Sequence, residues 1–152
     1  MEEYLREKKR EYSEERKVPY SLEDLRNIMK ILRSDEGCPW DRRQTFESMI
    51  PCVTEEAEEV AQAVKRQDMD NLCEELGDLL FQVIFYSQMA QEQDLFAFEQ
   101  VVDRISAKMV RRHPKIFGGR VPETGEEEGS LWEQIKRAEK AEKARAEKAK
   151  KA

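Results

Sequence analysis

The sequence predicts an all-α protein, a bundle of four to five helices that is completed by dimerisation. Apolar residues recur at the 3.6-residue spacing of a helix in successive stretches of the chain, and no segment is a convincing strand. Residues 79–85 are apolar on nearly all sides, which is typical of a helix at the centre of a bundle or covered by another subunit. At 152 residues the chain has material for one domain, and at this size a second copy would help to bury its apolar surface.

Composition and charge exclude several classes of protein. Charged residues make up 39% of the chain and the net charge is −6, so no nucleic-acid polymer is expected as a partner. The three cysteines are an odd number without CxxC spacing, and there is neither a signal peptide nor an apolar run long enough to cross a bilayer. These features predict a soluble, reduced, cytoplasmic protein that does not enter a membrane.

The chain divides into three parts by composition. Residues 1–18 are mostly charged and are expected to form a mobile or weakly helical arm. Residues 19–118 carry the helical periods and form the predicted folded domain. Residues 119–152 form a loop and a charged helix without an apolar stripe, for which Ser130 and Glu133 make the expected capping box.

Caps and prolines predict the helix boundaries at the start of the domain. Ser21 and Asp24 have the spacing of a capping box and open the first helix, which ends before Gly37. Residues 46–50 are expected to form a short helix that leads directly into the next one.

The later boundaries rest on signals of the same kind. Pro51 is well placed in the first turn of a helix that runs to about Arg66. Asp68 or Asp70 caps the following helix, which includes the strongly apolar stretch. Residues 96–110 repeat the helical period once more and mark the fourth helix, which Pro114 ends.

Two of these helices carry a pair of acids three residues apart. The first pair is Glu56 and Glu59, and the second is Glu75 and Asp78, which Gln82 extends by one turn. At 100° per residue each pair lies along the flank of an apolar stripe, so packing through the stripes would bring the two acidic edges together. The residues expected to be buried in these stripes are Val53, Ala57, Val60, Ala61 and Val64, and Leu72, Leu76, Leu79, Leu80 and Val83.

Facing acidic edges predict a divalent cation between them. Carboxylates about 4 Å apart repel by roughly 4 kcal/mol at an effective dielectric constant near 20, and a cation removes that repulsion. The four acids form an oxygen-only ligand set, which suits Mg²⁺ or Mn²⁺ rather than zinc. Gly77, in the middle of the second helix, is interpreted as a point of close backbone approach. The alternative is that the acids are the solvated shoulder of two amphipathic helices.

The loop GCPWDRRQT, residues 37–45, combines an aromatic ring with polar groups between two helices. Trp40 offers a flat face for stacking on a base or another ring, and Gln44 offers an amide that can bind an amide-like edge. The alternative is that Trp40 is a hydrophobic plug beneath the loop.

Basic residues gather at the end of the fourth helix. Lys108, Arg111 and Arg112 are candidates to bind phosphate, although cations are also favoured at a helix C-terminus by the helix dipole alone. The neighbouring His113 is expected to be structural rather than catalytic.

The order of these segments resembles the MazG family of nucleoside triphosphate pyrophosphohydrolases. The matching segments are GCPWDRRQT, EExxE at residues 55–59, ExxD at residues 75–78, KMVRRHPKIFGG and LWEQIKRAEK, and together they cover about residues 21–140. The resemblance implies an all-α enzyme that cleaves nucleoside triphosphates between the α and β phosphates with Mg²⁺, giving a monophosphate and pyrophosphate. It also implies a homodimer or a dimer of dimers.

The resemblance also assigns roles to single residues. Glu56, Glu59, Glu75 and Asp78 match the metal ligands, with Glu55 as an outer ligand or the base that orients water; Lys108, Arg111 and Arg112 are candidates for the triphosphate, and Trp40 and Gln44 for the base or sugar. Two features depart from the family pattern. Phe46 stands where many members have histidine, and this chain has no room for the second copy of the domain that many members carry.

Two other classes of protein also have helices with paired acids. Carboxylate-bridged di-iron bundles use Glu-x-x-His pairs, and the single histidine, His113, is far in sequence from both acid pairs. A non-catalytic interaction module with a structural carboxylate metal site would instead use the charged ends, residues 1–18 and 136–152, to bind partners.

Overall fold

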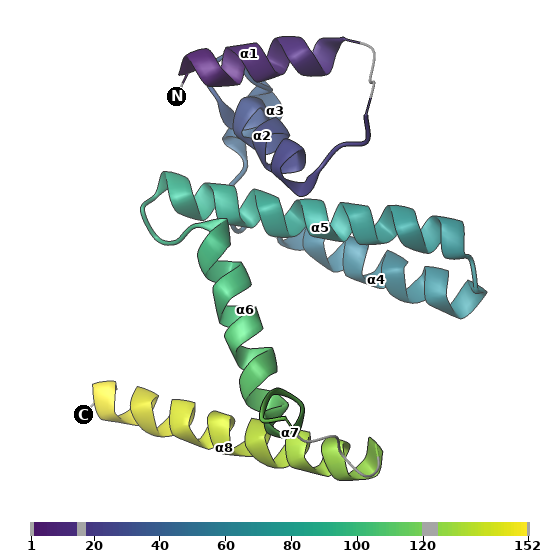
Figure 1. The fold of residues 1–152 in the computed structure, drawn as a ribbon. Helices are drawn as coiled ribbons and strands as arrows, with labels where there is room; N and C mark the ends of the chain where they lie inside the picture. Colours follow the sequence, from purple (N-terminus) through teal and green to yellow (C-terminus); the bar gives the residue numbers. More distant parts are fainter. Residues whose placement is uncertain (1, 15–17, 120–124, 152) are drawn as a thin grey trace. The chain divides into compact units, whose positions relative to one another are not determined.

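The computed structural model describes residues 2–14, 18–119 and 125–151, and these residues form helices and no strands (Figure 1). The helices are α1 (Glu2–Ser13), α2 (Leu22–Arg33), α3 (Pro39–Arg43), α4 (Ile50–Arg66), α5 (Met69–Glu92), α6 (Phe98–Arg112), α7 (Pro114–Phe117) and α8 (Gly125–Lys151). The all-α prediction is therefore confirmed for the described residues. No helix among them has the length and apolar character needed to cross a membrane. The chain forms two compact units, Met1–Phe98 and Glu99–Ala152.

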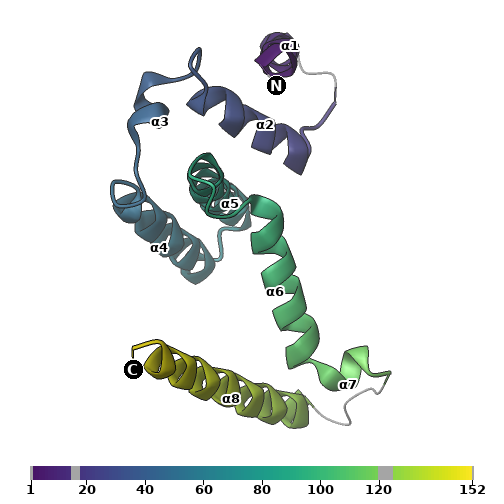
Figure 2. The ribbon, with the colours of Figure 1, turned by 90° about the vertical axis from the view of Figure 1, so that its left-hand side faces the viewer.

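Helix α5 is the centre of the first unit. It contacts α2 and α4, and in Figure 2 it lies between them. The side chains that these helices bury together are Met29, Met49, Ile84, Phe85 and Met89. This core lies against the C-terminal half of α5, which supplies Ile84, Phe85 and Met89 to it. The N-terminal half of α5 has α4 as its neighbour and carries the acids.

The predicted start of α2 is confirmed. Ser21 Oγ accepts a hydrogen bond from the backbone of Asp24, and the Asp24 carboxylate accepts one from the backbone of Ser21, which is the capping box expected from the sequence. The helix ends at Arg33, and a Cβ on Gly37 would lie 2.2 Å from the Ile31 carbonyl oxygen. Only glycine therefore fits this turn without moving the backbone.

The boundaries of α4 and α5 also follow their local signals. Pro51 lies in the first turn of α4, and the Asp68 side chain caps α5 by accepting a hydrogen bond of 3.1 Å from the Asn71 backbone. Gln67, between the two helices, has a left-handed φ of 57°, which turns the chain back. The prediction of a short helix at residues 46–50 is wrong, because residues 46–49 form turns and α4 begins at Ile50.

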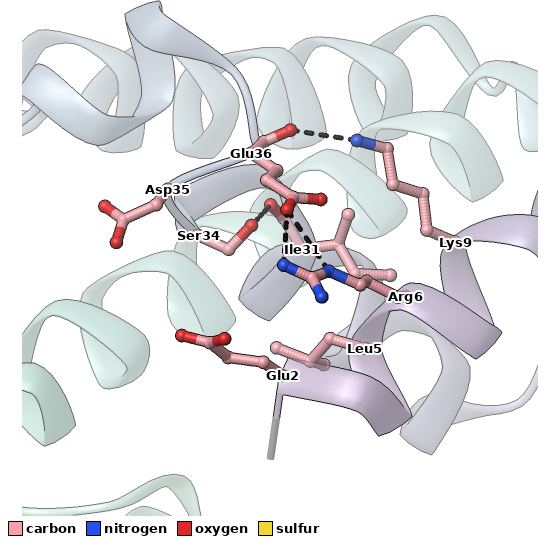
Figure 3. A pocket seen from close by; sticks show the side chains of 8 residues that line it. All are labelled: Glu2, Leu5, Arg6, Lys9, Ile31, Ser34, Asp35 and Glu36. Carbon is pink, nitrogen blue, oxygen red and sulfur yellow. Dashed lines mark hydrogen bonds and ion pairs between the residues drawn. The ribbon is translucent and has the colours of Figure 1, made fainter.

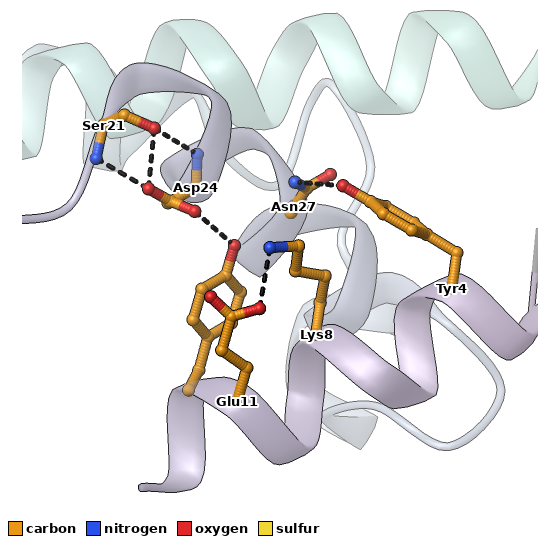
Figure 4. A network of polar contacts seen from close by, with 7 residues as sticks. Tyr4, Lys8, Glu11, Ser21, Asp24 and Asn27 are labelled. Carbon is orange, nitrogen blue, oxygen red and sulfur yellow. Dashed lines mark hydrogen bonds and ion pairs between the residues drawn. The ribbon is translucent and has the colours of Figure 1, made fainter. Parts of the chain in front are cut away.

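The N-terminal arm forms α1 over residues 2–13 and lies against α2. Tyr12 donates a hydrogen bond of 2.8 Å to Asp24, and Asn27 donates one of 3.1 Å to the Tyr4 hydroxyl (Figure 4). Arg6 donates to the Glu36 carboxylate at 2.7 Å. No residue of α1 is buried, so polar contacts rather than a shared apolar core hold α1 on α2.

A pocket of about 250 Å³ lies between α1 and the end of α2 (Figure 3). Arg6 crosses it to reach Glu36, and Lys9 donates a hydrogen bond of 2.9 Å to the Glu36 carbonyl. Two of the basic residues that line the pocket are therefore bound to one of its acidic residues.

The prediction that the apolar stripes of α4 and α5 are buried is largely wrong within the single chain. In α4, Val64 is 52% exposed and Ala63 is fully buried; in α5, Leu76 is 50% exposed and Gln82 only 5%. Ala57, Ala61, Leu80 and Val83 are exposed as well. The two helices thus pack through the faces that carry their acids, about 100° away from the stripes.

Gly77 does not mark a close approach within this chain. A Cβ built on it meets no atom within 4 Å among its described neighbours. The interpretation drawn from its mid-helix position is wrong for the chain by itself.

The second unit contains most of α6 together with α7 and α8. Glu139 of α8 accepts hydrogen bonds from Arg111 at 2.8 Å and from Arg112 at 2.6 Å. The ring of His113 lies 4.9 Å from that of Trp132. The prediction of a capping box at Ser130 is wrong, because α8 begins at Gly125 and Ser130 lies inside this helix. Residues 120–124 of the predicted loop lie outside the described residues.

Candidate functional site

The hairpin of α4 and α5 brings the two acid pairs together. The helices run side by side (Figure 1), and carboxylate oxygens of Glu56, Glu75 and Asp78 all lie within 4.8 Å of one another. The charge of Glu59 raises the pKa of Glu75, so Glu59 lies close to this group. We call these four residues the acidic cluster. Its members were selected from the sequence, although the packing that brings them together was not.

The electrostatics of the acidic cluster are unfavourable without a cation. Burial raises the pKa of Glu56, and the charge of Asp78 raises it further. Burial likewise raises the pKa of Glu75, with Glu59 as the next cause, while a hydrogen bond with Asn71 acts in the opposite direction. Both carboxyl groups therefore hold their protons more tightly than a solvated glutamate does.

The geometry suits a hard cation. Opposite ligands of an octahedral Mg²⁺ lie roughly 4.2 Å apart, since each Mg–O bond is about 2.1 Å. Oxygens within 4.8 Å of one another can reach this spacing through small side-chain rotations. The donors of the acidic cluster are all carboxylate oxygens, so the cluster could hold a metal ion.

The other acids of α4 differ in their relation to the cluster. Glu55 is exposed, and its charge contributes to the raised pKa of Glu56. Glu58 is also exposed and is not among the groups that shift the pKa of Glu56 or Glu75. Glu58 is therefore the matched control for substitutions of the acidic cluster.

Trp40 lies at the surface rather than beneath its loop. It begins the short helix α3 with Pro39 and is 51% exposed, which disfavours the hydrophobic plug. Gln44 donates a hydrogen bond of 2.9 Å to the Trp40 carbonyl and accepts one of 2.8 Å from Ser48. The Gln44 amide thus stabilises the loop that presents the Trp40 ring.

The basic candidates belong to the second unit. Arg111 and Arg112 both bind Glu139, and this contact holds the pKa of Glu139 below its usual range. The Arg112 guanidinium also lies 5.1 Å from the centre of the Trp132 ring. Lys108 is half-buried in α6.

Two further polar residues of α5 lie on the face of the acids, and only Gln82 was selected from the sequence. Asn71 acts to lower the pKa of Glu75, and its position four residues earlier in the helix was an available signal. Gln82, expected beside the apolar stripe, is buried on the acid-bearing face. The signal for Gln82 was its spacing of four residues from Asp78.

Comparisons with known proteins agree with this site. Residues 44–117, which include the acidic cluster, match the family model described as the MazG nucleotide pyrophosphohydrolase domain. The chain is 49% identical over 124 residues to a protein of Escherichia coli strain K12 named nucleoside triphosphate pyrophosphohydrolase, covering 81% of this chain and 47% of the relative. A Thermotoga maritima protein named nucleoside triphosphate pyrophosphohydrolase/pyrophosphatase MazG is 43% identical over 122 residues, 80% of this chain and 46% of the relative. The chain thus spans about half the length of these curated relatives.

A solved structure supports the same assignment. The crystal structure of a mazG-related protein from Thermotoga maritima superposes with a TM-score of 0.63 at 31% sequence identity, and the match covers 76% of this chain and 99% of that one. Sequence, fold and the position of the acidic cluster all lead to one conclusion: the chain belongs to the MazG family.

Proposed function

We propose that this protein is a nucleoside triphosphate pyrophosphohydrolase that cleaves ribo- or deoxyribonucleoside triphosphates between the α and β phosphates. The products are the nucleoside monophosphate and pyrophosphate. One observation carries the proposal: the acidic cluster contains the one group of possible metal ligands found among the described residues, and it lies inside the segment that matches the family model. The free state of all three cysteines supports action in a reducing compartment such as the cytoplasm.

The residues of the acidic cluster hold the catalytic ion in this proposal. Glu56, Glu75 and Asp78 supply the ligand oxygens that already lie together, and Glu59 completes the set beside Glu75. Mg²⁺, or Mn²⁺ in its place, would neutralise charge on the phosphates and lower the pKa of a bound water. Glu55, exposed next to the cluster, is the proposed outer ligand or the base that orients the attacking water.

Other residues bind the rest of the substrate. The exposed face of Trp40 stacks on the base, and Gln44 supports the loop or contacts the base or sugar. Lys108, Arg111 and Arg112 bind the triphosphate. Because Arg111 and Arg112 already pair with Glu139, phosphate must compete with that carboxylate for them.

The active form is proposed to be a homodimer or a dimer of dimers. One face of the hairpin is apolar and exposed in the single chain: Ile50, Ala57, Ala61 and Val64 on α4, and Met69, Leu76, Leu80 and Val83 on α5. Each stripe lies about 100° beyond the face that packs on the neighbouring helix, and since the helices are antiparallel both stripes turn to the same side. Such a continuous apolar face fits a second copy of itself.

Sedimentation of a Leu76→Lys variant tests the dimer. The wild-type protein is expected to sediment with at least the mass of two chains, and the variant as one chain, because a charge at the centre of the face must be desolvated. Leu95→Lys is the control, since Leu95 is 59% exposed but lies outside α4 and α5. A wild-type protein that stays monomeric at high concentration contradicts the dimer.

Pyrophosphate release tests the reaction. The purified protein is incubated with each of the eight common ribo- and deoxyribonucleoside triphosphates, with Mg²⁺ and with EDTA. The expected products are monophosphate and pyrophosphate, formed with Mg²⁺ and lost in EDTA. Release of inorganic phosphate instead would contradict cleavage between the α and β phosphates. Metal binding without hydrolysis of any of the eight would favour the non-catalytic module with a structural metal site.

A further inference from the structure

Gln82 has an amide oxygen that lacks a hydrogen-bond partner. The residue is 5% exposed, and its Oε1 is one of two buried side-chain acceptors without a partner among the described residues. The other belongs to Asn27, whose amide nitrogen binds Tyr4 in the contact between α1 and α2. A buried acceptor without a donor is unfavourable, and in a native structure it calls for an explanation such as an absent water or ion.

The neighbouring hydroxyl donors on α5 are already engaged. Ser87 donates to the Val83 carbonyl at 2.7 Å, and Tyr86 donates to the Phe46 carbonyl at 3.1 Å. Each hydroxyl has a single proton to donate, so neither serves Gln82. The partner of Gln82 therefore has to come from outside these side chains.

Gln82 lies on the same face of α5 as two residues of the acidic cluster. Glu75, Asp78 and Gln82 are separated by three and four residues, so they share one face of α5. A carboxylate oxygen of Glu56 on α4 lies within 4.8 Å of oxygens of Glu75 and Asp78, which places this face of α5 against α4. Gln82 follows Asp78 by one helical turn on the face that packs on α4.

We propose that Gln82 is a positioning residue whose Oε1 accepts a hydrogen bond from a water molecule bound to the metal ion of the acidic cluster. The inference rests on the proposed function, since it requires that the acidic cluster binds metal. Mg²⁺ keeps several of its waters when it binds to proteins. An acceptor that binds a water of the ion lies at most roughly 4.8 Å from the ion, the sum of a Mg–O bond and a hydrogen bond. This distance is close to the length of a helical turn.

The neutral amide suits this role better than a carboxylate. A further acid on this face would add charge to a cluster in which Glu56 and Glu75 already repel their neighbours. An amide oxygen accepts the same hydrogen bond without that charge. Gln82 would thus orient the water and fix the ion while leaving the net charge of the site unchanged.

Three variants and Mn²⁺ alone test the proposal. Gln82→Met keeps the shape of the side chain and removes the acceptor, Gln82→Glu keeps the acceptor, and Gln91→Met is an exposed control on the same helix. Mn²⁺ affinity is measured by calorimetry without nucleotide, and the unfolding midpoint is measured in EDTA.

Gln82→Met is expected to weaken Mn²⁺ binding about tenfold or more, while its midpoint in EDTA equals or exceeds that of the wild type. Gln82→Glu is expected to retain Mn²⁺ binding but to unfold at a lower temperature in EDTA. Gln91→Met should match the wild type in both.

Unchanged Mn²⁺ affinity in Gln82→Met overturns the proposal, and a lower midpoint in EDTA with unchanged affinity would show a packing role instead. These failures differ from failure of the proposed function. If the wild type binds no Mn²⁺, the metal site and the inference both fail. If Gln82→Met weakens Mn²⁺ binding but the wild type hydrolyses no nucleotide, the inference stands and the proposed reaction fails.

Discussion

Two helix contacts in the first unit are both made with charged side chains, but the pKa of the carboxyl groups is lowered in one contact and raised in the other. Where α1 meets α2, Asp24 accepts hydrogen bonds from Tyr12 of α1 and from the Ser21 backbone in its own helix cap, each at 2.8 Å, and its pKa is held at about 2, chiefly by the Ser21 side chain. Between α4 and α5, acid faces acid, and burial with neighbouring charge raises the pKa of Glu56 and Glu75. The first contact is complete within the chain, whereas the second brings together acids that could hold a metal ion.

The largest expected effect is on catalysis. Asp78→Asn or Glu59→Gln should lower pyrophosphate release at least about 100-fold with the fold retained, because a lost metal ligand removes several kcal/mol of transition-state stabilisation. Helix content by circular dichroism checks the fold. Glu58→Gln, an exposed position on the same helix, should keep wild-type turnover. A folded Asp78→Asn enzyme with normal turnover at saturating Mg²⁺ would contradict the assignment.

The next effect is on stability in the presence of metal. A Mg²⁺ concentration about 100 times the dissociation constant should stabilise the protein by about 2.7 kcal/mol, a rise of roughly 5 to 10 °C in the unfolding midpoint. Calorimetric scans with Mg²⁺ and with EDTA measure the difference. The rise should disappear in Asp78→Asn and persist in Asp24→Asn, since Asp24 belongs to the complete contact. An equal rise in Asp78→Asn would show that the metal binds elsewhere.

Substitutions without metal should have opposite signs in the two contacts. In EDTA, Glu75→Gln should raise the unfolding midpoint because it removes charge from a repelling cluster, with Glu74→Gln as an exposed control on the same helix. Asp24→Asn should lower the midpoint because the carboxylate loses charge-assisted hydrogen bonds. Two changes of the same sign would remove the contrast on which the metal assignment depends.

The smallest effect is the pH dependence of the contact between α1 and α2. Because the pKa of Asp24 is lowered from 3.8 to about 2, its stabilisation is complete above pH 4 and is lost as the pH falls towards 2. Burial raises the pKa of Tyr12 from 10.0 to about 12, so its stabilisation is complete below pH 10 and is lost as the pH rises towards 12.

Denaturant titrations across pH measure this dependence. Tyr12→Phe should abolish the alkaline loss and keep most of the acid loss, since the Ser21 side chain is the larger cause of the lowered pKa of Asp24. If Tyr12→Phe still loses its full stability at alkaline pH, the loss arises from a titrating group other than Tyr12.

Features encoded over a few residues were predictable from the sequence. The capping box at Ser21, the proline of α4 and the Asp68 cap depend on hydrogen bonds or sterics within one turn, and all three are confirmed. The members of the acidic cluster were found for the same reason, since acids three residues apart share a helix face.

Features that depend on distant partners were not predictable. Helical periodicity shows that the apolar stripes with Val64 and Leu76 favour burial. It does not show whether this chain or a second copy buries them. The faces of α4 and α5 that pack were therefore assigned about 100° from their true position. The attachment of α1 depends on pairs such as Tyr12 with Asp24, which leave no period in the sequence.

The most direct test of the central claim is anomalous diffraction from crystals grown with Mn²⁺ and a non-hydrolysable nucleoside triphosphate analogue. The account predicts the strongest anomalous peak between Glu56, Glu75 and Asp78, at about the 2.1 to 2.2 Å from carboxylate oxygens that such a hard ion adopts. A strongest peak at any other place, in a protein that hydrolyses nucleoside triphosphates with Mn²⁺, would contradict it.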